Sequence, residues 1–82
     1  MLQAGKRYST STKHGSRVIV GRMEIERIEG DTAIAWAYTH EYSPSRPEQK
    51  TRTFYPQFPI SPDRVNDAGA VRVLQLDWQP EE

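Results

Sequence analysis

Apolar and polar side chains alternate along residues 16–40 in a pattern that is typical of two β-strands joined by a turn. In the first half, Met23 and Ile25 stand at odd positions with charged residues between them. In the second half the phase reverses, because Trp36 and Tyr38 stand at even positions and alternate with alanines. A period of two residues gives a strand one apolar and one polar face. The stretch therefore predicts a long β-hairpin.

The turn at residues 30 and 31 sets the expected register of this hairpin. A two-residue loop places Ile25 opposite Trp36 and Met23 opposite Tyr38, so the four large apolar side chains share one face. A register shifted by one residue would turn half of them to solvent. Glycine in the first loop position suits a type II′ turn, and a four-residue loop preserves the same register. We expect these four side chains to form the inner wall of the fold.

The segments on either side of the hairpin predict shorter strands. Residues 6–12 are rich in Tyr, Thr and Ser and predict an opening strand at the edge of the sheet. Gly21 predicts a bulge where the long strand bends. Residues 41–49 contain two prolines and two serines and predict a loop. A strand resumes over residues 50–55 and ends at Pro56, because proline has no N–H to donate.

Proline then recurs every third residue over residues 56–62, which is the period of polyproline II and predicts an extended connector. Ser61 followed by Pro62 predicts one helical turn, and residues 70–78 predict the last strand. Five strands and one helical turn give an all-β meander. We expect it to close into a small barrel, because an open sheet would leave one face wet. The helical turn before the last strand resembles the order of SH3-like barrels.

The length and composition indicate a single small domain over residues 1–82, with loose ends at residues 1–5 and 79–82. Zero cysteines exclude a disulfide framework and a thiolate metal site, and they fit a cytoplasmic protein. No segment has the apolar character of a signal peptide or a membrane span. We therefore expect no membrane partner.

The charges cancel overall but are distributed unevenly along the chain. The protein carries 11 basic and 11 acidic side chains. The first 22 residues contain no acid, but they contain Lys6, Arg7, Lys13, Arg17 and Arg22. This asymmetry predicts a basic surface, provided that folding does not mix the two kinds of segment in space.

The residues that catalyse reactions in other proteins stand in unfavourable contexts here. His14 and His40 are the only histidines, too few for a zinc site without cysteine. Ser16 lacks the glycine pattern of a nucleophile elbow. Glu24 and Glu26 share a predicted ionic face, which is exposed to solvent and favours a structural role over a catalytic one. We expect neither an enzyme nor a cofactor.

The expected function is a non-enzymatic interaction module that binds a partner protein or a second copy of itself as a homodimer. It would use an exposed strand edge or an aromatic patch around Tyr42 and Tyr55. The alternative is a nucleic-acid-binding module that uses the basic N-terminal hairpin and the proline loop, because cations neutralise phosphates and rings stack on bases. The candidate binding residues are Lys6, Arg7, Tyr8, Lys13, Arg17, Tyr42, Arg46, Lys50, Arg52 and Tyr55.

Overall fold

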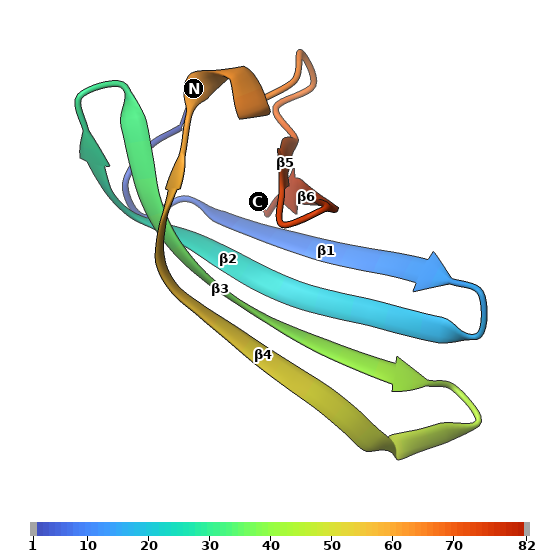
Figure 1. The fold of residues 1–82 in the computed structure, drawn as a ribbon. Helices are drawn as coiled ribbons and strands as arrows, with labels where there is room; N and C mark the ends of the chain where they lie inside the picture. The colour runs from blue at the N-terminus through green and yellow to red at the C-terminus, as the bar shows by residue number, and fades with distance from the viewer. Residues whose placement is uncertain (1, 82) are drawn as a thin grey trace.

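A computed structural model describes residues 2–81 as one curled, antiparallel sheet of six strands (Figure 1). The strands are β1 (Arg7–His14), β2 (Arg17–Glu29), β3 (Thr32–Ser43), β4 (Arg46–Ile60), β5 (Val71–Val73) and β6 (Leu76–Pro80). One turn of 3-10 helix, η1 (Pro62–Arg64), precedes β5. The predicted all-β class, the small barrel-like fold and the helical turn before the last strands are confirmed, with six strands in place of five.

The spatial order of the strands is β4-β3-β2-β1-β6-β5. The first four strands form a meander, and the chain then returns through η1 to add the β5–β6 hairpin beside β1 (Figure 1). Within residues 2–81, β4 pairs only with β3, so the sheet is a half-barrel with an open side. The prediction of β1 as an edge strand is wrong, because its Tyr8 and Ser9 pair with Pro80 and Gln79 of β6.

The β2–β3 hairpin keeps the predicted register only beside its turn. Arg27 lies opposite Ile34 there, as the two-residue loop requires. A β-bulge at Glu26 then shifts the register by one residue, and Ile25 lies opposite Ala35 beyond it. The bulge predicted at Gly21 is absent from this hairpin, in which β2 is paired without interruption from Val18 to Ile25.

This shift divides the four large side chains that were predicted to share one face. Met23 and Ile25 are buried on the concave face of the sheet, whereas Trp36 and Tyr38 are half-buried on the convex face. The predicted inner wall is therefore wrong. A tightly curled sheet has little room on its concave face, which suits the small side chains of β3, whereas the outside of the curve separates neighbouring strands and accommodates large rings. The buried small residues are Ala33, Ala35 and Ala37.

The segments predicted as a loop and as a polyproline connector belong to strands. β3 continues to Ser43 and β4 begins at Arg46, so only a short turn remains of the loop expected at residues 41–49. β4 also runs through Pro56 and Pro59, and its register with β3 is irregular near Pro56. Both prolines are tolerated because β4 is an edge strand, whose outward backbone groups have no partner strand to bond.

The last predicted strand is divided in two by a tight turn. Leu74 and Gln75 have positive φ angles of 56° and 61°, and they reverse the chain between β5 and β6. A left-handed conformation costs a non-glycine residue about 1–2 kcal/mol. Two contacts offset this cost: Leu74 packs against the core, and the indole Nε1 of Trp78 donates to the Val73 carbonyl at 3.2 Å.

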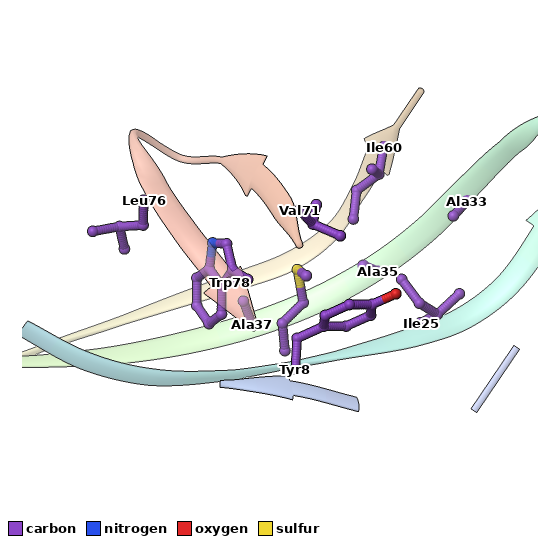
Figure 2. Close-up of a cluster of buried hydrophobic side chains, with 10 residues drawn as sticks. Tyr8, Ile25, Ala33, Ala35, Ala37, Ile60, Val71, Leu76 and Trp78 are labelled. Atoms are coloured by element: carbon purple, nitrogen blue, oxygen red, sulfur yellow. The ribbon is translucent and has the colours of Figure 1, made fainter. Parts of the chain in front are cut away.

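The hydrophobic core lies between the concave face of the sheet and the β5–β6 hairpin (Figure 2). Trp78 is fully buried at its centre, directly over Gly21 of β2. A Cβ atom at Gly21 would lie 3.1 Å from the Trp78 ring and 2.6 Å from the Tyr38 carbonyl oxygen. Gly21 is therefore the residue that lets the indole approach the sheet so closely. The other large buried side chains are Tyr8, Met23, Ile25, Ile60 and Val71.

The chain ends are held more firmly than predicted. The Gly5 N–H donates to the Ile25 carbonyl at 2.7 Å, and the Glu81 N–H donates to the Arg7 carbonyl at 2.9 Å. The loose ends predicted at residues 1–5 and 79–82 are thus tied to the sheet by backbone hydrogen bonds, although Met1 and Glu82 lie outside the described residues. No helix in residues 2–81 is long and apolar enough to cross a membrane.

Candidate functional site

Two strand pairs extend beyond the core to the same end of the molecule (Figure 1). Pairing of Val18 with Tyr42 brings the free end of β1–β2 beside the free end of β3–β4. We call residues 10–22 and 40–53 the hairpin arms; their tips extend beyond the core, whereas Gly21 and Arg22, at the base of one arm, lie against or beside it. The β4 side of the arms is exposed on both of its faces from Arg46 to Phe54.

The hairpin arms concentrate the positive charge of the protein. They contain six cations and two acids, which leaves five cations and nine acids in the rest of the chain. The Arg17 Nε donates to the Glu41 carboxylate at 2.6 Å. The other five arm cations form no ion pair with any residue in 2–81; they are Lys13, Arg22, Arg46, Lys50 and Arg52. The fold therefore turns a modest asymmetry of the sequence into a basic end and an acidic end.

A row of rings runs along the convex face into the arms. Trp36, Tyr38 and His40 follow one another at alternate positions of β3, and Phe54 of β4 lies directly opposite Tyr38. The Trp36 and Tyr38 ring centroids are 6.1 Å apart with nearly parallel planes, and Tyr38 and His40 are 5.8 Å apart. Trp36 and Phe54 are 6.4 Å apart. We call these four residues the outer aromatic row.

The outer aromatic row is open to solvent. Phe54 is 63% exposed, and the other three members are half-buried mainly against one another and the neighbouring strands. Figure 1 shows the N-terminal segment, η1 and the β5–β6 hairpin gathered on the concave side of the sheet. None of these elements covers the convex face, on which the outer aromatic row lies.

Cations stand on both sides of the outer aromatic row. Arg22 of β2 lies directly opposite Tyr38, and Arg52 of β4 lies directly opposite His40. Directly opposed residues of an antiparallel pair point to the same face, so both guanidinium groups share the convex face with the rings. Further along the arms, the Lys50 Nζ lies 6.0 Å from the centre of the Tyr42 ring. Rings and positive charges are thus interleaved across three strands.

The charge along the row changes from one end to the other. Glu24 lies opposite Trp36 and accepts a hydrogen bond from the Arg7 Nε at 2.9 Å, so the Trp36 end carries a balanced ion pair. The His40 end has Arg52 beside it, and no carboxylate of residues 2–81 lies within ion-pair distance of Arg52. An anionic ligand would therefore bind with its charge toward the arms.

Two hollows in the protein surface border the outer aromatic row. One, of about 230 Å³, is lined by Val20, Gly21, Arg22, Tyr38 and His40. The other, of about 430 Å³, lies beside Trp36 and Phe54 and is completed by Glu26, Pro56 and Gln57. Both are open depressions that have a ring of the row and a polar side chain among their lining residues.

Six of the ten residues predicted as binding candidates come together in the hairpin arms: Lys13, Arg17, Tyr42, Arg46, Lys50 and Arg52. Four lie elsewhere. Lys6 and Arg7 lie toward the other end of β1, where Arg7 is paired with Glu24. Tyr8 is 1% exposed in the core, so its ring is not accessible to a partner. Tyr55 lies on the concave side and packs edge-on against Phe58.

The outer aromatic row itself was not among the predicted binding residues. Trp36 and Tyr38 were predicted to lie on the inner wall, because large rings are usually buried. The alternating alanines of β3 indicate the opposite orientation, since small side chains suit the inside of a tight curve. Arg22, which lies beside the row, was counted with the basic N-terminal residues but not among the binding candidates.

The described residues show no arrangement for metal binding. Within residues 2–81, no three side chains of His, Asp or Glu gather closely enough to hold a metal ion. Comparison of the chain with protein-family models, with curated proteins and with solved structures gave no match. The function is therefore argued from the chemistry of the hairpin arms and the outer aromatic row.

Proposed function

We propose that this protein is a non-enzymatic, cytoplasmic module that binds nucleic acid through its basic hairpin arms. The observation that carries the proposal is the gathering of five cations without an ion-pair partner in residues 2–81 at one end of the molecule. Cations that are not neutralised by the protein itself are available to phosphates, which supply most of the affinity of non-specific nucleic-acid binding. A cysteine-free chain suits the cytoplasm.

The distribution of charge supports a polyanionic ligand in spite of the zero net charge. The acids outnumber the cations outside the arms, so a phosphate chain is attracted to one end and repelled from the other. Lys13, Arg22, Lys50 and Arg52 share the convex face by their register or their contact with Tyr42, and there they would contact phosphates of one bound strand. Four such contacts predict that the logarithm of the affinity falls with the logarithm of the salt concentration with a slope of about −3 for single strands.

The test is fluorescence anisotropy of a labelled oligonucleotide titrated with the protein at several salt concentrations. Arg52→Ala should reduce the steepness of the salt dependence by about one unit and weaken binding to all sequences alike. Arg64→Ala is the matched control, because Arg64 is exposed, lies outside the arms and forms no ion pair in residues 2–81. Absence of binding to any oligonucleotide at low salt would refute the proposal.

A second candidate function is protein binding or self-association through the outer edge of β4. The observation that favours it is that β4 pairs only with β3 within residues 2–81 and is exposed on both faces from residue 46 to residue 54. Its outward backbone groups are available to an added strand, and residues 48–55 contain no proline to prevent the pairing. A module of this kind would suit the SH3-like arrangement that the sequence predicts.

Sedimentation velocity at micromolar concentration tests this second function. Self-association predicts a species of twice the 9.5 kDa mass of the chain, and a heterologous partner predicts a shift only when that partner is added. A chain that remains monomeric throughout, and that retains no partner on an affinity column, would contradict it.

A further inference from the structure

We infer that the outer aromatic row stacks on the bases of a single-stranded nucleic acid, so that the ligand of this module is an unpaired strand and not a duplex. This inference rests on the proposed function, because the phosphates of the same strand would lie against the cations of the hairpin arms. The inference adds that the bases are the groups recognised. The residues that recognise them are Trp36, Tyr38, His40 and Phe54.

The first argument is the position of the rings. Phe54 is 63% exposed, and Ile28, at 41%, is the only other large hydrophobic residue exposed in the described part of the chain. Ile28 lies at the opposite end of β2, away from the row. Phe54 contacts Trp36, which in turn stacks on Tyr38, so the exposed ring continues a patch of π-faces. A π-face accepts any base, at about 1–3 kcal/mol for each stacked base.

The second argument is charge complementarity, which distinguishes a nucleic acid from a protein as the occupant. At the Trp36 end of the row the neighbouring polar groups are Glu24 and its partner Arg7, which carry both signs. At the other end the groups beside Tyr38 and His40 are Arg22 and Arg52, neither of which has an acidic partner in residues 2–81. Stacking rings between unpaired cations are the combination that single-strand binders use.

The third argument is the spacing of the rings. Consecutive centroids along β3 are 6.1 Å and 5.8 Å apart. Neighbouring bases in a duplex strand are stacked about 3.4 Å apart and have no free face. Side chains at alternate positions of a β-strand are spaced this widely, so a ligand that stacks on more than one ring needs bases that are separated from one another, as in an extended single strand. A duplex offers only phosphates to this surface.

The hollow beside Tyr38 and His40 shows how one base would be held. It has a volume of about 230 Å³, and Arg22 stands on its rim. A guanidinium group both stacks on a base and donates to its edge, so Arg22 would add to the stacking of Tyr38. The phosphate that follows the base would then lie toward Arg52, on the neighbouring strand.

The experiment compares three fluorescent probes of equal length: a thymidine oligonucleotide, an abasic oligonucleotide with the same phosphates, and a duplex. The test variant is Phe54→Ala, whose side chain is so exposed that its loss does not threaten the fold. The matched control is Ile28→Ala, which removes the other exposed hydrophobic side chain away from the row. Circular dichroism spectra would serve to check that both variants retain the β-sheet.

The expected result is that Phe54→Ala weakens binding of the thymidine oligonucleotide by about 5- to 150-fold, which corresponds to the loss of one stacked base. It should leave binding of the abasic strand unchanged, and Ile28→Ala should leave all three affinities unchanged. Wild-type protein should bind the thymidine strand more tightly than the duplex. Tyr38→Ala, which removes the ring at the centre of the row, should also weaken binding of the thymidine oligonucleotide.

Three results would overturn the inference. If the row variants bind the thymidine strand as wild type does, the arms bind phosphates alone, and the proposed function stands without base stacking. If no probe binds at low salt, both the proposed function and the inference fail. If Phe54→Ala leaves oligonucleotide binding intact but abolishes self-association in sedimentation, the row is a protein interface.

Discussion

Gly21 shows how far a single residue controls this fold. It lies between Trp78 and the backbone of β3, with no room for a Cβ atom. The nearest obstacle is the Tyr38 carbonyl oxygen, a backbone atom that cannot move without disturbing the sheet. Because Gly21 has no Cβ atom, Trp78 packs against β2 on the concave face and the Tyr38 backbone keeps its place in β3.

The first prediction concerns this position. Gly21→Ala should lower the free energy of unfolding by about 1–3 kcal/mol, the usual cost of overpacking, because the new methyl group would clash with the Tyr38 carbonyl oxygen and crowd the indole of Trp78. Urea unfolding monitored by circular dichroism measures the change. Ser11→Ala, at an exposed position of the neighbouring strand, is the control and should change the midpoint little. An unchanged midpoint for Gly21→Ala would show that Trp78 does not pack on β2 at this distance.

The second prediction concerns Tyr8 and alkaline pH. Burial raises the pKa of the Tyr8 phenol above its ordinary value of 10.0. In the unfolded chain the phenol loses its proton near pH 10, whereas the folded protein retains it, so the folded state binds more protons in this range. The contribution of Tyr8 to stability is therefore complete below pH 10 and is lost as the pH rises through the folded pKa.

Tyr8→Phe isolates this effect, because it keeps the ring and removes the hydroxyl. Wild type and variant should have a nearly constant difference in stability from neutral pH to about pH 9, and the wild type should then lose stability more steeply. Thermal unfolding at a series of pH values measures the stability of wild type and of the variant. A difference that stays constant through pH 11 would contradict the buried position of the phenol.

At the scale of the elements, the sequence indicated the turns that contain glycine better than the faces of the strands. Gly15 and Gly30 have positive φ angles of 59° and 66° at the tips of the first two hairpins, where glycine is the expected residue. The bulge at Glu26 has no comparable signal, because a charged residue at that position continues the polar phase of β2. The curl of the whole sheet decides where the extra residue goes.

The contrast between local signals and strand faces also explains which residues of the candidate site could be predicted from the sequence. The arm cations follow from the sequence, because a charged residue on a strand end is exposed on either face. The placement of Trp36 and Tyr38 depends on the register, and a shift of one residue moves a side chain to the other face of the sheet. The turn between β5 and β6 was missed for a related reason, since Leu74 and Gln75 are not typical turn residues.

The third prediction concerns that turn. Gln75→Gly should raise the free energy of unfolding by roughly 0.5–1 kcal/mol, because glycine adopts a φ of 61° without steric cost and the Gln75 side chain is exposed. Gln79→Gly is the matched control in β6 and should be destabilising by a similar amount. Chemical denaturation of the two variants provides the comparison. A loss of stability in both would indicate that β5 and β6 are not joined by this left-handed turn.

At the scale of the whole molecule, the fold separates a stable part from a binding part. The hydrophobic core lies toward the acidic end of the molecule. The tips of the hairpin arms extend away from this core and bury little apolar surface. The longest dimension of the molecule is 44 Å, about twice the shortest at 21 Å, which reflects this extension. An arm that is held mainly by backbone hydrogen bonds opens more readily than the core.

The fourth prediction follows from this division. Amide hydrogens of residues 46–53 should exchange with deuterium faster than those of β2 and β3 beside the core, and a bound oligonucleotide should slow them. Hydrogen exchange followed by mass spectrometry resolves the two regions. Equal protection of arms and core in the free protein would contradict the separation.

Trp36 lies on the outer face of the sheet, where we propose that it binds a ligand, whereas Trp78 is buried in the core. The difference between the fluorescence of wild type and of Trp36→Phe isolates the emission of Trp36, and this surface substitution leaves the core intact. The account predicts a long-wavelength emission that acrylamide quenches readily and that a thymidine oligonucleotide quenches at low salt. A short-wavelength emission that neither acrylamide nor the oligonucleotide affects would place Trp36 in the interior and contradict the account.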